Sequence, residues 1–265
     1  MQVVSISSLK GGVGKTSVTL GLASAALVAG VDTLVVDLDP HADATTGLGV
    51  EPGSASSIGA LLRNPRRGSV DDSAVPSSWT LRQRRRVPKA SSRLDVIHGS
   101  ALTGYYDRPD LRPRELRRLA RVLEGSRRYE LVLIDCPPSL SGLTRMAWFA
   151  SNGVTLVAEP SLFSVAGTER SMRALDLFRS EFSTKLGTVG VVANRYRDSS
   201  PEHAFRLSEL RSMFGDKLLS PVIPETSNWQ QIQGAAHAVH HWPGDAAKET
   251  AGVFEALLGS IRQAL

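Results

Sequence analysis

Two lysines flank a glycine-rich run near the start of the chain, in Lys10-Gly11-Gly12-Val13-Gly14-Lys15-Thr16. Glycines let successive backbone N–H groups approach phosphate oxygens, an approach that a side chain would block. Lys15 is placed to reach the β- and γ-phosphates of a nucleotide, and the Thr16 hydroxyl is placed to bind Mg²⁺. The run therefore predicts a phosphate-binding loop, with a ligand-free glycine turn as the alternative.

Carboxylates follow two further apolar runs. Asp37 and Asp39 lie at the end of the run 33–38, and Asp135 directly follows the run 131–134. Ligands of parallel sheets bind at the carboxyl ends of the strands, where a carboxylate can hold Mg²⁺ beside phosphates, usually through water. These three residues are therefore candidates for a metal site next to the loop. Carboxylates that only cap turns are the alternative.

These groups must be positioned by the elements around them. Apolar, β-branched runs that indicate strands alternate with stretches of helical composition. The strand candidates are 3–8, 33–38, 94–97, 131–134, 154–157, 189–193 and 218–223, and the helix candidates are 17–28, 113–124, 165–181 and 201–214. This alternation predicts an α/β fold with a doubly wound, mostly parallel sheet and helices on both faces, in one domain that spans residues 1–265.

Residues 51–93 interrupt this alternation. Pro, Gly, Ser and Arg dominate the segment, so we expect a long loop, a basic and flexible insertion within the domain. Basic charge extends beyond it, because residues 63–128 hold 17 Lys and Arg against 7 Asp and Glu. Such a stretch suits an anionic partner, although a solvated basic face is the plainer interpretation.

Composition narrows the class of protein. With 265 residues and 42% hydrophobic content, the chain can bury a core without disulfide or metal staples. Cys136 is the single cysteine of the sequence, so no internal disulfide can form. No apolar run approaches transmembrane length and no signal-like segment precedes the first strand candidate. We therefore expect a cytoplasmic protein without an integral membrane segment.

The glycine-rich loop departs from the standard Walker A motif, because Leu9 stands where that motif has its first glycine and Lys10 adds a lysine. In this the loop resembles the deviant Walker A of the ParA/MinD family of P-loop ATPases. The run 37–49 is similar to the switch I of that family, and Asp135-Cys136-Pro137-Pro138-Ser139-Leu140 to its switch II. The similarity covers nearly the whole chain outside the basic insertion and is greatest to ParA/Soj-like partitioning ATPases.

The resemblance implies a role for each matching residue. Lys10 reaches the phosphates bound by the other subunit of a sandwich dimer, Lys15 binds the phosphates of its own subunit, and Asp39 positions the attacking water. The implied ATP contacts are Lys10, Gly11, Gly12, Val13, Gly14, Lys15, Thr16 and Ser17, with Asn194 and Pro224 on the adenine side. The implied Mg²⁺ group is Thr16, Asp37, Asp39 and Asp135.

Switch I departs from the family pattern at two positions. His41 stands where the family has Gln, and Asp43 where it has Asn. The departure allows an unusually slow hydrolysis or a switch that answers a different partner.

The resemblance also implies a function. The chain is expected to form a homodimer with ATP, to hydrolyse ATP slowly until a ParB-like partner stimulates it, and to act in chromosome partitioning or intracellular positioning. The ATP dimer is expected to bind DNA without sequence preference, which would associate the protein with the nucleoid. Its candidate DNA contacts are Arg195, Arg197, Arg206 and Arg211, although Glu225 stands where ParA proteins commonly place Arg.

Other functions stay open at this stage. A MinD-like switch would use a terminal helix that binds the membrane through basic residues. Here the terminal stretch has an apolar stripe at helical spacing, but Arg262 is the only cation among its last fourteen residues, which favours packing of this helix in the core. A protein-directed switch, a weakly hydrolysing nucleotide-dependent binding module, and a metabolic kinase or synthetase are further alternatives. An iron-sulfur protein with a cluster between two subunits needs two cysteines per chain and is excluded.

Overall fold

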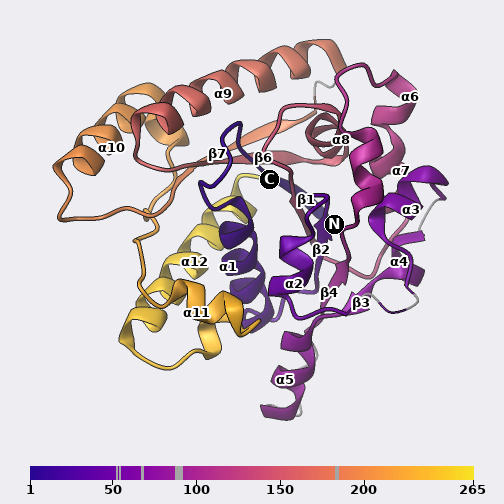
Figure 1. Cartoon of the computed structure of the whole chain (residues 1–265), viewed down its shortest axis with the longest axis horizontal. Helices are drawn as coiled ribbons and strands as arrows, with labels where there is room; N and C mark the ends of the chain where they lie inside the picture. Colours follow the sequence, from indigo (N-terminus) through magenta and orange to yellow (C-terminus); the bar gives the residue numbers. More distant parts are fainter. Residues whose placement is uncertain (52, 54, 67–68, 87–91, 183–184) are drawn as a thin grey trace.

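A parallel sheet forms the centre of the molecule (Figure 1). The structure is a computed structural model, and it describes residues 1–265 except 52, 54, 67–68, 87–91 and 183–184. In this described part the sheet has seven strands in the order β3-β4-β2-β5-β1-β6-β7, and only β3 and β4 pair antiparallel. The strands are β1 (Gln2–Ser7), β2 (Thr33–Asp37), β3 (Val75–Pro76), β4 (Leu94–Ile97), β5 (Leu131–Asp135), β6 (Gly153–Ala158) and β7 (Gly187–Ala193).

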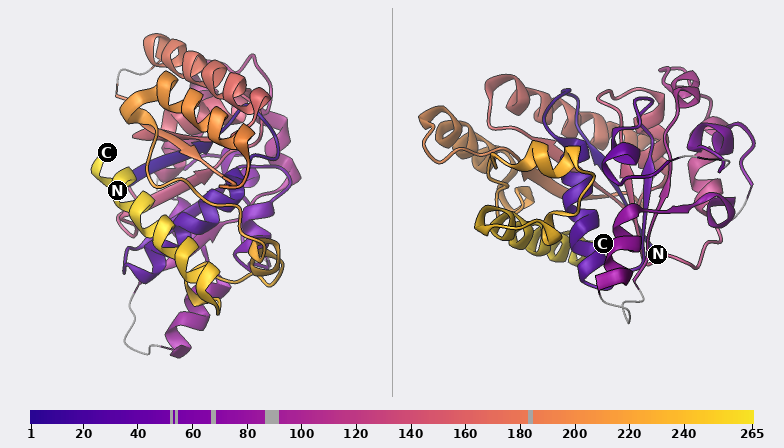
Figure 2. Two further views of the ribbon diagram at one scale, coloured as in Figure 1. Left: turned by 90° about the vertical axis from the view of Figure 1, so that its left-hand side faces the viewer. Right: turned by 60° about the horizontal axis from the view of Figure 1, so that its bottom comes forward.

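Helices lie on both faces of the sheet, which confirms the predicted doubly wound α/β fold (Figure 1, Figure 2). Helices α1, α11 and α12 pack on one face, whereas α3, α7 and α8 pack on the other. The α-helices are α1 (Lys15–Val28), α2 (Asp43–Gly47), α3 (Ile58–Arg63), α4 (Ser69–Ser73), α5 (Ser78–Arg86), α6 (Pro113–Leu116), α7 (Arg118–Leu123), α8 (Gly142–Ala150), α9 (Leu162–Phe182), α10 (Pro201–Phe214), α11 (Trp229–Gly234) and α12 (Asp245–Gln263). The 3₁₀ helices are η1 (Ala101–Tyr106), η2 (Gly215–Lys217) and η3 (Val239–His241).

The central strands are apolar on both sides because helices cover both. Successive side chains of a strand point to opposite faces. In β2, Val35 packs toward α1 and α12, whereas Leu34 and Val36 pack toward α3, α7 and α8. Leu133 and Ile134 of β5 divide in the same way. This two-sided burial explains why these strands appear in the sequence as continuous rather than alternating apolar runs.

Two expected elements differ in the structure. Residues 218–223 do not form a strand. Isolated bridges at Leu218 and Pro224, and backbone hydrogen bonds from Leu219 and Ile223 to the carbonyls of Val191 and Ala193, connect this segment to the end of the sheet. Pro221 and Pro224 lack the backbone N–H that a continuous ladder needs, so the strand prediction was wrong. The helix expected over 113–124 is divided at Arg117 into α6 and α7.

The segment 51–93 is more regular than its composition suggests. Its described residues form α3, α4, β3 and α5, so the expectation of a long loop was wrong for them. Ile58, Leu61 and Leu62 have helical spacing and are buried in the core. Trp79 is also buried, and its indole N–H donates to the carbonyl of Ala236 at 2.9 Å. A few apolar anchors therefore order this segment despite the Pro, Gly, Ser and Arg around them.

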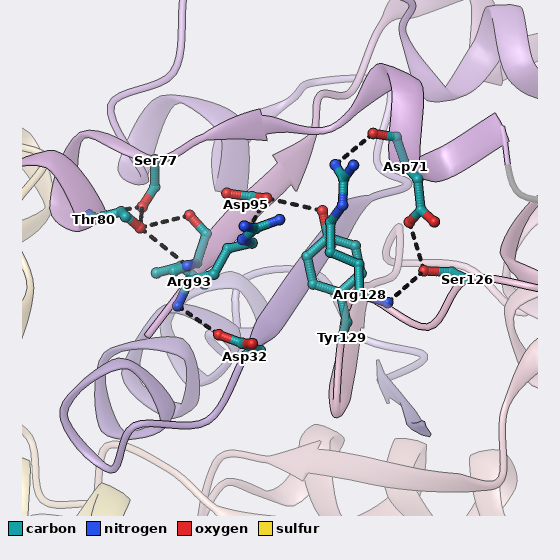
Figure 3. A network of polar contacts seen from close by, with 10 residues as sticks. Asp32, Asp71, Ser77, Thr80, Arg93, Asp95, Ser126, Arg128 and Tyr129 are labelled. Atoms are coloured by element: carbon teal, nitrogen blue, oxygen red, sulfur yellow. Dashed lines mark hydrogen bonds and ion pairs between the residues drawn. The ribbon is translucent and has the colours of Figure 1, made fainter. Parts of the chain in front are cut away.

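A polar network joins α4 and β4 to the start of β5 (Figure 3). The Tyr129 hydroxyl donates to Asp95 at 2.9 Å, and the Arg128 guanidinium donates to the carbonyl of Asp71 at 2.6 Å. The Ser126 hydroxyl donates to the Asp71 carboxylate at 2.6 Å. These bonds attach α4, part of the segment 51–93, to the edge of the sheet where β4 and β5 begin. This edge is opposite the strand ends that carry Asp37 and Asp135.

The C-terminal helix α12 packs on α1. Phe254, Leu257 and Ile261 are buried in the core, which confirms the prediction of a core-packed terminal helix. Gly21 of α1 lies directly beneath the ring of Phe254, where a Cβ atom would collide with ring carbons. None of the described helices is long and apolar enough to cross a membrane.

We expect Gly21→Ala to lower the free energy of unfolding by about 1–3 kcal/mol, because the added methyl overpacks the α1–α12 contact. Gly259→Ala is the matched control, since its Cβ would meet no heavy atom within 4 Å. It should raise stability by about 0.5–1 kcal/mol through helix propensity. Urea unfolding measures both, and equal effects of the two variants would contradict the packing argument.

Candidate nucleotide site

The glycine-rich loop connects β1 to α1 and leaves its backbone open to a ligand. Gly12 and Gly14 have φ angles of 79° and 91°, a left-handed conformation that favours glycine. A Cβ atom on Gly14 would also collide with the amide of Asn194. The structure thus gives the loop the conformation expected of a phosphate cradle, directly before the N-terminus of a helix.

Lys15 and Asp135 are buried together beneath this loop. Thr16 and Thr19 each donate a hydroxyl hydrogen bond of 2.7 Å to the Asp135 carboxylate, one to each oxygen. Burial lowers the pKa of Lys15, and the negative charge of Asp135 partly offsets this. The buried ammonium group therefore lies in the field of a fixed carboxylate, in a position where it would attract a phosphate.

The pairing of β2 with β5 places Asp37 opposite Asp135. One oxygen of Asp37 accepts hydrogen bonds from the backbone N–H and the hydroxyl of Thr45, at 2.7 and 2.6 Å. The other oxygen is buried without a hydrogen-bond partner. Burial, followed by the nearby Asp135, raises the pKa of Asp37 to about 7, and burial raises the pKa of Asp135 to about 6. Two adjacent carboxylates that are costly to ionise fit a site for a cation.

Asp39 lies at the rim of the same hollow, just beyond β2. Its carboxylate accepts a hydrogen bond of 3.0 Å from the backbone N–H of His41. The hollow has a volume of about 420 Å³, and its lining includes Lys15, Thr16 and Asp39. His41 and Asp43, the two departures from the switch I pattern, also line it. The structure therefore brings the loop, Asp39 and switch I to one place, whereas Asp37 and Asp135 are fully buried at the ends of β2 and β5 and do not line the hollow.

A second hollow of about 320 Å³ continues from the first and shares Ser17 and Arg195 with it. Asn194 and Pro224, the expected adenine-side residues, both line this second hollow. The amide of Asn194 donates to the carbonyl of Val13 at 2.8 Å, so this side chain also holds the loop.

Two residues of the site were not assigned to it from the sequence. Arg195 donates to the carbonyl of Gly12 at 2.8 Å and lines both hollows, although it was expected to contact DNA. Gln233 donates to the Ser17 hydroxyl at 3.1 Å from α11. No local pattern marks Gln233, whereas the position of Arg195 beside Asn194 at a strand end was an available signal.

Lys10 differs from Lys15 in its surroundings. It does not line the nucleotide hollow. Its ammonium nitrogen lies 3.7 Å from the Glu159 carboxylate and 3.4 Å from the Ser161 hydroxyl, both in the β6–α9 connection. The two lysines of the loop thus have separate partners within one chain.

The other expected DNA contacts lie on or near α10. Arg206 forms ion pairs with Glu202 and Glu209, and Arg197 forms one with Glu225 at 3.2 Å. Arg211 is exposed on the same helix.

The residues present fit a nucleotide with Mg²⁺. Among the described residues, no group of three or more His, Cys, Asp and Glu side chains could hold a metal ion by itself. Mg²⁺ commonly binds through one or two carboxylates, a hydroxyl, water and substrate phosphates. The hydroxyl of Thr16, the unpaired oxygen of Asp37 and the carboxylate of Asp135 suit that incomplete set.

The raised pKa of Asp37 predicts a dependence of stability on pH. Because the folded chain binds more protons than the unfolded chain between about pH 4 and 7, stability falls as the pH rises through this range. In the absence of nucleotide and Mg²⁺, Asp37→Asn should therefore raise Tm by roughly 10 °C at pH 8 and have little effect near pH 4.

Asp43→Asn, at an exposed carboxyl in α2, is the control and should leave the pH profile unchanged. Differential scanning calorimetry over this pH range provides the measurement. A Tm difference between Asp37→Asn and the wild type that is the same at both pH values would contradict the assignment.

Comparisons with known proteins identify relatives of this chain. The family model described as "AAA domain" matches residues 1–188. The chromosome partitioning protein ParA of Caulobacter vibrioides is 32% identical over 230 residues, covering 84% of this chain and 80% of the relative. The sporulation initiation inhibitor protein Soj of Bacillus subtilis is 30% identical over 230 residues, covering 84% of each.

Solved structures give the same fold. The septum site-determining protein MinD of Pyrococcus horikoshii, complexed with Mg-ADP, superimposes with a TM-score of 0.74 at 23% identity. The match covers 98% of this chain and 95% of that one. With the loop, the carboxylates and the sheet order in place, these similarities lead to one assignment: the chain belongs to the ParA/MinD family of P-loop ATPases.

Proposed function

We propose that this protein, as a single ATPase domain, is a Mg-ATP-dependent switch that dimerises with ATP and slowly hydrolyses it. The observation that carries the proposal is the separation of the two loop lysines. Lys15 is buried in the nucleotide hollow of its own chain, whereas Lys10 lies outside it, against Glu159. A lysine that does not serve its own nucleotide is available for the nucleotide of a second subunit.

Each side chain then has a role in hydrolysis. Lys15 binds the phosphates, Thr16, Asp37 and Asp135 hold Mg²⁺ directly or through water, and Asp39 orients the attacking water. When bound, Mg²⁺ would neutralise phosphate charge and remove the electrostatic cost of two buried, ionised carboxylates. Lys10 of the second subunit would add positive charge to the phosphates, so dimer formation and hydrolysis are coupled.

We propose chromosome or DNA partitioning as the process, with non-specific DNA and a ParB-like activator as partners and a nucleoid-associated location in the cytoplasm. The names of the Caulobacter and Bacillus relatives support this choice. A membrane-directed switch has less support, because the apolar stripe of α12 is buried against α1.

A second candidate is a nucleotide-dependent binding module with little turnover. His41, an exposed residue whose backbone holds Asp39, favours it, because it alters the segment that would orient water. Steady-state ATPase rates with and without DNA and a candidate activator distinguish the two. A rate that no partner raises would favour the module.

Lys10→Ala should bind ATP about as tightly as the wild type but remain a monomer, because it removes only the group that serves the second subunit. The wild type should double its mass with ATP and Mg²⁺, and Lys15→Ala should lose nucleotide binding itself. Light scattering after size exclusion and equilibrium binding of a fluorescent ATP analogue measure these properties. A Lys10→Ala dimer formed as readily as the wild-type dimer would refute the proposed role.

The Lys10–Glu159 pair should oppose dimerisation, because the ammonium group must leave the carboxylate to reach a second nucleotide. Glu159→Gln removes this attraction, and we expect it to tighten the ATP dimer by roughly two- to fivefold, the size of an exposed ion pair. Glu169→Gln, which breaks an ion pair with Arg173 on α9, is the control. Analytical ultracentrifugation with ATP provides the readout, and weaker association of Glu159→Gln would exclude a restraining role.

A further inference from the structure

Helices α3, α6 and α7 lie together at one side of the molecule (Figure 1). Five arginines from this region line a surface hollow. The hollow has a volume of about 830 Å³ and shares no lining residue with the nucleotide hollow. Its arginines are Arg63, Arg114, Arg117, Arg118 and Arg121. We call this surface the arginine face.

Helical spacing and two specific contacts build the arginine face. Residues 114, 117, 118 and 121 recur at intervals of three or four, so they share one side of α6 and α7. The Arg118 guanidinium donates to the carbonyls of Leu62 and Arg63 at 2.6 and 3.0 Å, which fixes the end of α3 beside α7. Arg117 lies over the ring of Phe149, 5.5 Å from its centroid. Arg118 therefore has a structural role, and the guanidinium groups of the other arginines point toward solvent.

The charge of this face is only partly compensated, because Glu124 is the one acidic residue against five arginines among the described residues that line the hollow. In the part of the chain that the structure describes, no ion pair joins Arg63, Arg114, Arg117 or Arg121 to a carboxylate, and all four residues are exposed. The stretch 112–121 carries five arginines and one glutamate, and that glutamate, Glu115, already pairs with Arg108 at 2.8 Å. Unpaired positive charges that repel one another are stabilised by a polyanion.

Helix α10, the other basic candidate, is different. It carries two arginines and two glutamates, and both glutamates pair with Arg206. Arg197 is also paired, with Glu225. The electrostatic potential therefore favours the arginine face over α10.

We propose that the arginine face binds the phosphodiester backbone of DNA without reading its sequence. Guanidinium groups match phosphate oxygens in paired hydrogen bonds. Seven residues of helical rise extend about 10 Å, comparable to about three phosphates of one strand at 3.4 Å of axis each. This inference rests on the proposed DNA-binding function and assigns it a surface within a single chain.

Because the arginine face lies within one chain, it predicts how DNA binding depends on the bound nucleotide. The ADP-bound monomer should bind DNA weakly, because every arginine of the face is already present. The ATP dimer carries two such faces, so on a long duplex it should bind more tightly through avidity.

The test compares two triple variants that lose the same charge. Arg114→Ala with Arg117→Ala and Arg121→Ala removes three arginines of the face but keeps Arg118. Arg173→Ala with Arg206→Ala and Arg211→Ala removes three positive charges of α9 and α10, of which Arg173 and Arg211 are exposed and Arg206 is largely covered. Fluorescence anisotropy with a random-sequence duplex is measured against salt concentration, with ADP and Mg²⁺ present. Melting temperature and nucleotide affinity verify that both variants fold.

We expect the face variant to bind at least about tenfold more weakly and its salt slope to fall by roughly 2–3, about 0.9 for each lost phosphate contact. The control should retain the wild-type slope. Equal losses in both variants, or a loss in the control alone, would overturn the inference while leaving DNA binding intact.

Two outcomes separate this inference from the proposed function. Wild-type protein that dimerises with ATP but binds no duplex in either nucleotide state would refute the DNA role and the inference together. Tight binding of poly-glutamate that is lost in the face variant, with no DNA binding, would instead identify the arginine face as a site for an acidic protein and overturn the proposal.

Discussion

The functional site depends on the parallel pairing of β2 with β5, which sets Asp37 against Asp135 at the ends of two buried strands. Burial removes the hydration of both carboxylates and raises the pKa of both, and the nearby charge of Asp135 raises the pKa of Asp37 further. Lys15 and the hydroxyls of Thr16 and Thr45 offset part of that cost. A divalent cation and phosphates would complete the balance and stabilise the two carboxylates in their ionised form.

This arrangement connects ligand binding to the rest of the molecule. Thr16 and Thr19 attach α1 to Asp135, and Thr45 attaches α2 and switch I to Asp37. A change of charge at the carboxylates therefore acts on the loop and on switch I together. Lys10 lies outside this network and is held by Glu159, so its release is a separate event. These contacts provide a physical connection through which nucleotide binding can affect the association of two subunits.

The basic stretch 63–128 illustrates that tertiary packing determines which charges gather on one surface. In the sequence its arginines are spread over one helix candidate, 113–124, and a segment of irregular composition. In the structure the Arg118 bonds to the end of α3 bring Arg63 beside the arginines of α6 and α7. On α10, by contrast, neighbouring glutamates neutralise Arg206. Arginines with and without neighbouring carboxylates therefore give surfaces of very different potential.

The sequence by itself determined the loop 10–16, the strand-end carboxylates and the order of most strands and helices, because glycine geometry, apolar runs and strand ends are local signals. Only the tertiary structure decided three matters. It placed Arg195 and Gln233 in the nucleotide site, ordered the described part of 51–93 through anchors such as Trp79, and left 218–223 without a strand. The first two depend on partners distant along the chain, which no local pattern contains, whereas at 218–223 the prolines 221 and 224 lack the backbone N–H that a strand needs.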